Sequence, residues 1–169
     1  ANLLNTNFSG YLNDEFLNIV NGVPRNVELN VNFNHETSNI FIENRFSLLK
    51  EKYNQRINNL NSLNESKPCV FVHHLSNIAT IGNLVKSVHR FRGDNKDDLL
   101  LIICTQKEFD ASLFPAKHES LEVACKHIPL PYSDYIWHAE KHYSSIDGCK
   151  FERDIVKFVS GQVIQKYKK

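Results

Sequence analysis

Titratable or polar side chains stand directly after four apolar segments of the chain. His35 and Glu36 follow "VELNVNF", His73 and His74 end "CVFVHH", Thr105 follows "LLLIIC", and His127 ends "SLEVACKH". An imidazole acts as a general acid or base near neutral pH, and a neighbouring carboxylate can orient it. These positions predict acid–base chemistry or the binding of a polar ligand.

The two adjacent histidines cannot both serve one site, because neighbouring side chains of a strand point to opposite faces. We favour His74, because it is the first residue beyond "CVFVH". The side chains of that segment are needed for packing, whereas the residue after it is free to turn over the edge of the sheet. Cys104 ends "LLLIIC" and is either a thiolate activated by a nearby imidazole or a small core residue. Cys69 begins its strand, so we expect it at the opposite edge.

The elements that must position these residues follow from hydrophobic periodicity. Alternation predicts a strand at Val27–Phe33, and apolar runs predict further strands at Cys69–His73, at Leu99–Cys104 and over "SLEVACKH". The segment "NDEFLNIV", closed by Asn21-Gly22, predicts a short helix. Residues 40–63 predict one long amphipathic helix, and residues 76–91 predict another. This alternation predicts an α/β fold with a three-layer, mostly parallel, Rossmann-like sheet flanked by helices.

Ligands of such sheets bind outside the carboxyl ends of the strands, where neighbouring strands lie about 4.8 Å apart. We therefore expect His35 and His74 to lie close together, in a pocket that Thr105 also lines. The candidate catalytic residues are His35, Glu36, His74 and Cys104, and the candidate substrate-binding residues are His73, Ser76, Thr105, Arg56 and His127.

Composition limits the classes of partner. The 169 residues predict a single α/β domain over 1–169, and an Ala1 start without any Met is consistent with a piece of a longer protein. A net charge of +1 and the lack of a long apolar run argue against nucleic acid and membrane as partners. The four cysteines show no zinc spacing, so we expect free thiols in the cytoplasm and no metal. No cofactor is expected, because no GxGxxG, Walker or GxSxG motif occurs.

The run from "FNHETSNIF" through "KYNQRI" and "KPCVFVHH" to "LLLIICTQ", and thinly to "IWHAEKHY", resembles an uncharacterised bacterial family named as papain-like cysteine peptidases. The resemblance covers roughly Asn30 to His142 and places His35, Tyr53 and Arg56 on the family's motifs. The family's cysteine-bearing N-terminal block has no counterpart before Ala1. Papain-like enzymes also combine a helical lobe with an antiparallel barrel, so we follow the periodicity for the fold.

Three functional classes stay open. The resemblance implies a cysteine- or histidine-dependent hydrolase or transferase with His35 as acid or base. Its nucleophile is either replaced by Cys104 or lost with a missing segment, in which case the isolated chain is inactive. The second class is an α/β enzyme that handles a carbohydrate or nucleotide sugar through His35, His74 and Thr105. The third is a non-catalytic binding or assembly module, and none of these features specifies an oligomeric state.

Overall fold

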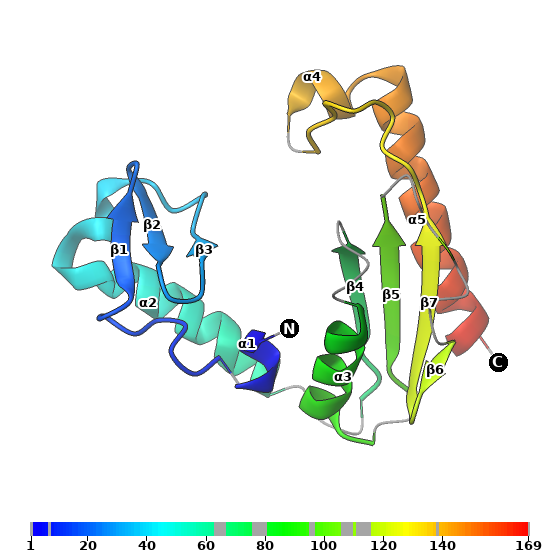
Figure 1. The fold of residues 1–169 in the computed structure, drawn as a ribbon, viewed down its shortest axis with the longest axis horizontal. Coiled ribbons are helices and arrows are strands. Elements are labelled where there is room, and N and C mark those ends of the chain that lie inside the picture. The colour runs from blue at the N-terminus through cyan, green and yellow to red at the C-terminus, as the bar shows by residue number, and fades with distance from the viewer. Residues whose placement is uncertain are drawn as a thin grey trace. The chain divides into compact units, whose positions relative to one another are not determined.

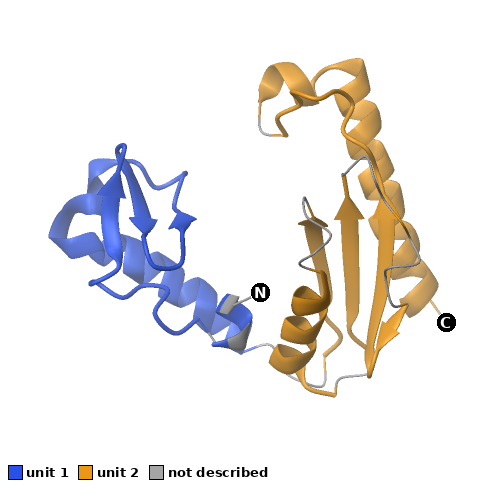
Figure 2. Cartoon of the chain, viewed as in Figure 1, with its two compact units in different colours: residues 1–64 blue, residues 65–169 orange. Residues whose placement is uncertain are grey.

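The computed structural model describes residues 2–6, 8–62, 67–75, 81–94, 97–105, 110, 116–137 and 139–168. The chain divides into two compact units, residues 1–64 and residues 65–169 (Figure 2). Each unit contains helices and a β-sheet of its own (Figure 1). The predicted α/β class is therefore confirmed, and the two units are described separately below.

The first unit contains a three-stranded antiparallel sheet in the order β1-β2-β3. Its elements are α1 (Asn2–Asn5), β1 (Leu17–Val20), β2 (Val23–Asn26), β3 (Val31–Asn32) and α2 (Asn39–Asn61). Asn21 and Gly22, with φ of 52° and 76°, connect β1 to β2. Positive φ at both central residues is the requirement of a tight type I′ hairpin. The predicted helix over "NDEFLNIV" is wrong, because its last four residues form β1 and Asn-Gly closes a hairpin.

The predicted parallel strand Val27–Phe33 is also wrong. Residues 27–30 form a turn, and only Val31–Asn32 pairs, antiparallel to β2. The buried side chain of Asn26 explains the turn: its amide nitrogen donates to the carbonyls of Gly10 and Tyr11, and its oxygen accepts from the N–H of Leu29. His35 therefore follows an antiparallel sheet, and the geometric argument that placed it beside His74 does not apply.

Aromatic residues surround the small core of the first unit. Leu17, Phe33 and Leu49 are buried, and the half-buried residues packed against them are Tyr11, Leu12, Phe41, Phe46 and Tyr53. Leu49 is completely buried, as the helical spacing predicts. The helix is not continuous, however, because Asn44, Arg45 and Phe46 have φ of 50°, 54° and 60°. Phe41, before this break, and Phe46, at its last residue, both pack against the core.

The second unit contains a four-stranded sheet in the order β4-β5-β7-β6. Its strands are β4 (Val70–Leu75), β5 (Leu99–Cys104), β6 (Lys117–His118) and β7 (Leu121–His127), and its helices are α3 (Ile81–Arg92), α4 (Glu140–Tyr143) and α5 (Ile146–Tyr167). β4, β5 and β7 are parallel neighbours, and β6 is antiparallel to β7. The mostly parallel sheet is thus confirmed for this unit, with three of the four predicted strands in it.

Strand β5 is buried on both faces, as its unbroken apolar sequence predicts. Leu99, Leu101 and Ile103 belong to one core with Phe151 and Phe158 of α5. Helix α3 buries the predicted stripe of Ile81, Leu84, Val85 and Val88. The packing of β5 and α3 therefore agrees with their sequences, because the spacing of the apolar residues in each segment is that of the strand or helix that it forms.

A buried ion pair joins the amino ends of β4 and β5 to the end of α3. Arg92 Nε donates to Asp98 Oδ2 over 2.7 Å, and a terminal guanidinium nitrogen donates to the carbonyl of Lys67 over 2.7 Å. Asp98 Oδ1 accepts from the backbone N–H of Cys69 over 2.8 Å. One charged pair therefore holds three separate segments in place.

Within the described part of the chain, the helices are too short or too polar to cross a membrane.

Truncation of Leu49 tests the core of the first unit. Leu49→Ala should lower the free energy of unfolding by about 2–5 kcal/mol, because it removes a fully buried side chain and leaves a cavity. The neighbouring Leu48 is 38% exposed, so Leu48→Ala is a matched control with an expected change within about 0.5 kcal/mol. Urea denaturation measures both. A loss below about 1 kcal/mol for Leu49→Ala would place this residue outside the core.

Removal of one partner tests the ion pair of the second unit. Asp98→Ala should cost about 3–5 kcal/mol of unfolding free energy, because the buried Arg92 loses its counter-charge. Glu122→Gln breaks the 2.7 Å pair with Lys166, in which the Glu122 side chain is 48% exposed, and should cost less than about 1 kcal/mol. Equal effects of the two variants, measured by urea denaturation, would contradict this ranking.

Candidate functional site

The parallel strands of the second unit end in register. Leu75 lies opposite Cys104, and Cys104 lies opposite His127, so the carboxyl ends of β4, β5 and β7 form one edge. Figure 1 shows α4 and the start of α5 beyond this end of the sheet. Polar side chains at this edge can converge on one ligand, as the sequence predicts.

His74 and Thr105 form the first contact of this edge. His74 Nε2 lies 2.8 Å from Thr105 Oγ1, which is hydrogen-bond distance. The pairing follows from register, because His74 lies opposite Ile103 and Thr105 continues β5 by one residue beyond its end. The structure thus brings together the two residues of the second unit that we expected to share a pocket.

Trp137 completes the contact and was missed from the sequence. Its ring lies 4.9 Å from the His74 ring, centroid to centroid, at an interplanar angle of 44°. The side chain remains 37% exposed, and its other edge contacts Phe151 at 5.0 Å. A signal was present, since Trp137 is the only tryptophan and stands in the polar, proline-containing segment after the last strand.

Several contacts hold the segment that carries Trp137. The buried ring of His142 accepts a hydrogen bond at Nδ1 from the backbone N–H of Ile136 over 2.7 Å, and it packs between Tyr132 and Tyr135. Gly148 lies so close to this segment that a Cβ there would be 2.1 Å from the carbonyl oxygen of His142. Trp137 is therefore positioned by α4 and the first turn of α5.

A cavity of about 320 Å³ lies between residues 128–131 and the start of α5. Its walls combine apolar residues of the "IPLP" segment and Phe151 with the charged groups of Asp147, Lys150 and Asp154. Phe151 contacts Trp137, and Trp137 contacts His74. A chain of ring contacts thus links Phe151 in the cavity wall to the His74–Thr105 pair.

The histidines of β4 have perturbed acidity. Partial burial lowers the pKa of His74 below its ordinary value, and burial is also the main cause that lowers the pKa of His73. Desolvation disfavours the charged imidazolium in both cases. At neutral pH the His74 ring is therefore uncharged, so Nε2 can accept a hydrogen bond from a hydroxyl group.

Three of the four cysteines, Cys69, Cys104 and Cys125, are poorly suited to chemistry at this edge, whereas Cys149 is exposed on α5. Cys104 is completely buried, in the position of a core thiol. Burial raises the pKa of Cys125 to about 12, and burial likewise raises the pKa of Cys69, which precedes β4 at the opposite edge. His127 is half-buried and ends β7 beside Cys104.

Three predicted site residues belong to the first unit, and two of them, Glu36 and Arg56, have other contacts there. Glu36 is buried and accepts a hydrogen bond from Lys52 Nζ over 2.6 Å. The guanidinium of Arg56 lies over the Tyr53 ring at 4.9 Å, and His35 is exposed in a turn. His73 is exposed on β4, opposite Ile102, and Ser76 lies outside the described residues.

Acidification tests the environment of His74. A pKa below the ordinary value of 6.5 in the folded state means that the unfolded chain binds the proton more readily. The free energy of unfolding should therefore be unaffected by this group above about pH 6.5 and should fall as the pH drops below that value. His74→Gln should make this fall shallower in thermal unfolding between about pH 7 and 5. Identical pH profiles of the two proteins would contradict the partial burial of the ring.

Comparisons with protein-family models, with curated proteins and with solved structures gave no match, so the function has to be argued from the residues of the site.

Proposed function

We propose that the second unit is a Rossmann-like module that binds a small carbohydrate-like ligand at the carboxyl edge of its parallel sheet. The observation that carries this proposal is the contact of His74 with both Thr105 and Trp137. A sugar ring presents hydroxyl groups around its rim and apolar C–H groups on its faces. This ligand class needs hydrogen-bonding side chains beside an aromatic surface.

Each side chain has a distinct role in this proposal. The exposed ring of Trp137 supplies the surface against which a sugar ring packs. Thr105 Oγ1 and the uncharged imidazole of His74 exchange hydrogen bonds with ligand hydroxyl groups, since each offers both a donor and an acceptor. The charged residues that line the cavity, Lys150 with Asp147 and Asp154, suit a polar extension of the ligand such as a diphosphate or a second sugar.

A thiol-dependent hydrolase, which the family resemblance implies, has less support. Covalent catalysis at the carboxyl edge needs an accessible thiolate there, whereas Cys104 is fully buried and burial raises the pKa of Cys125 to about 12. The exposed thiol of Cys149 contacts the carbonyl of Tyr143 instead. Within the proposed site, His74 is the group that can act as an acid or base on a bound hydroxyl. A transferase would use His74 in this way, whereas a non-catalytic binding module would use the same side chains only to hold the ligand.

The single tryptophan makes ligand binding directly observable. Titration with UDP-glucose should change the fluorescence of Trp137 in a saturable manner, because the ligand's sugar ring displaces water from the indole face. Thr105→Val should weaken binding by about tenfold, because it removes one hydrogen bond to the ligand, and a loss of about 1.4 kcal/mol raises the dissociation constant by that factor. Thr37→Val changes an exposed threonine of the first unit in the same way and should leave the affinity unchanged.

UDP without the sugar is the matched ligand for this experiment. It should bind at least about tenfold more weakly than UDP-glucose if the sugar contacts Trp137. Equal affinities for the two ligands would contradict recognition of the sugar. An unchanged Trp137 emission at millimolar concentrations of UDP-glucose and of glucose would reject the proposed site.

A further inference from the structure

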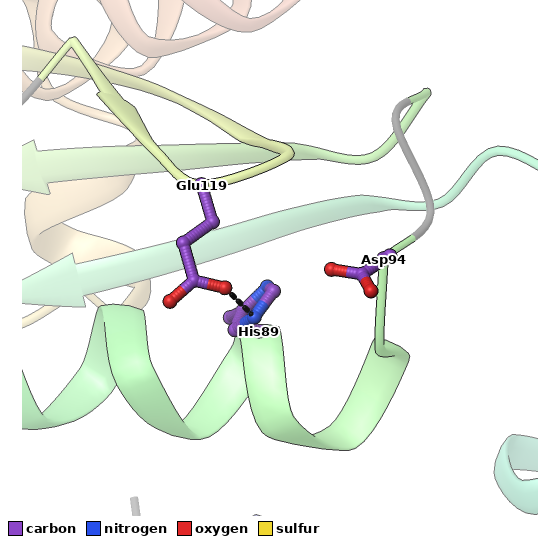
Figure 3. Close-up of side chains that lie close together, drawn as sticks. All are labelled: His89, Asp94 and Glu119. Atoms are coloured by element: carbon purple, nitrogen blue, oxygen red, sulfur yellow. Dashed lines mark ion pairs between the residues drawn. The ribbon is translucent and has the colours of Figure 1, made fainter.

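A second group of ligating side chains lies at the opposite, amino edge of the same sheet. His89 belongs to the last turns of α3, Asp94 follows the end of this helix, and Glu119 lies in the turn between β6 and β7 (Figure 3). One ligand atom from each of these residues lies within 4.8 Å of the other two. The His89 Nε2 and Glu119 Oε2 atoms are 2.5 Å apart.

The backbone directs all three side chains to this point. Gly93, with φ of 66°, ends α3 in the left-handed conformation, and its N–H donates to the carbonyl of His89 over 2.7 Å. This termination turns the chain so that the Asp94 carboxylate faces the His89 ring (Figure 3). Glu119 has a φ of 54°, an uncommon conformation for a residue other than glycine or asparagine, in the tight β6–β7 turn.

The electrostatics of this group favour a cation. The carboxylates of Asp94 and Glu119 face one imidazole, and like charges at this separation repel each other unless a positive charge lies between them. In the part of the chain that the structure describes, the adjoining cavity of about 760 Å³ is also lined by Lys117 and by Glu122, which pairs with Lys166. Among the described residues, Ser120 Oγ, whose residue lines this cavity, and His89 Nδ1, the other ring nitrogen of His89, are buried without a hydrogen-bond partner, which is unusual for polar atoms inside a protein.

We propose that His89, Asp94 and Glu119 bind a divalent first-row transition metal ion. One imidazole and two carboxylates form a mixed nitrogen and oxygen ligand set that suits such ions. Ligand atoms about 2.1 Å from a metal lie roughly 3.3 Å from one another. Metal binding would therefore replace the direct His89–Glu119 contact, with these two atoms moving apart and the Asp94 carboxylate moving by about 1 Å. Two of the three residues are exposed, so these rotations are unhindered.

The remaining coordination positions face the cavity that Asp94 and Glu119 line. A metal ion held by only three protein ligands keeps open positions for water or for a further ligand. The geometry therefore describes an open site, not a closed structural one. It lies apart from the proposed carbohydrate site, and neither proposal depends on the other. The sequence prediction of no metal was based on the spacing of the cysteines and did not consider residues 89, 94 and 119.

Mn²⁺ is the probe of choice, because it prefers nitrogen and oxygen ligands and avoids the free cysteines. Calorimetric titration of the chelator-treated protein with MnCl₂ should show one saturable site. Asp94→Asn and Glu119→Gln should each weaken binding at least tenfold. Both residues are exposed, so the variants should remain folded, which circular dichroism verifies.

Glu122→Gln tests whether Mn²⁺ is attracted only by the negative charge of this surface and not bound by the three proposed ligands. It removes one negative charge from the same cavity without touching the ligand set, and it should change the Mn²⁺ affinity less than twofold. Pulsed electron paramagnetic resonance of bound Mn²⁺ should detect one imidazole nitrogen, and His89→Gln should abolish that signal. Absence of saturable binding, equal weakening by Glu122→Gln, or a spectrum without nitrogen coupling would overturn the proposal.

Discussion

The buried ion pair between Arg92 and Asp98 is the interaction on which the second unit depends most. Charges removed from water are tolerated only when partners satisfy them completely, and here a guanidinium, a carboxylate and two backbone groups do so together. A shift of β4 against β5, or of α3 along the sheet, would leave one of these charges without a partner. The pair therefore selects one arrangement of three segments whose apolar residues alone would tolerate several.

This arrangement fixes which side chains lie close together at both edges of the sheet. At the carboxyl edge, the register that starts at Val70 opposite Leu99 brings His74 to Ile103 and hence to Thr105. At the amino edge, the fixed end of α3 brings His89 and Asp94 to the turn that carries Glu119. One sheet thus presents two separate groups of polar side chains. The first offers neutral hydrogen bonds beside an aromatic ring, and the second offers negative charge beside an imidazole.

The first unit is stabilised mainly by contacts between aromatic rings and by hydrogen bonds of asparagine side chains. Its short strands bury few residues, and its core consists of Leu49 with aromatic rings such as Tyr11, Phe33 and Tyr53 in mutual contact. Asparagines occupy several of the irregular backbone positions of this unit, since Asn21, Asn30 and Asn44 have positive φ. Asn26 is completely buried and makes three hydrogen bonds. Asparagine tolerates the left-handed conformation better than most residues. The asparagine-rich composition of this half of the chain thus serves its turns.

The sequence by itself determined those elements whose hydrophobic period is long and unbroken. The apolar run of β5, the stripe of α3 and the burial of Leu49 follow from side-chain spacing, and the His74–Thr105 contact follows from parallel register. Only the tertiary structure decided that Val27–Phe33 leaves the parallel sheet, because the hydrogen bonds of Asn26 outweigh a short alternating pattern. It also decided the positions of Trp137 and of His89 relative to Glu119. These contacts join residues far apart in the chain, and local spacing carries no information about which distant segment a turn will meet.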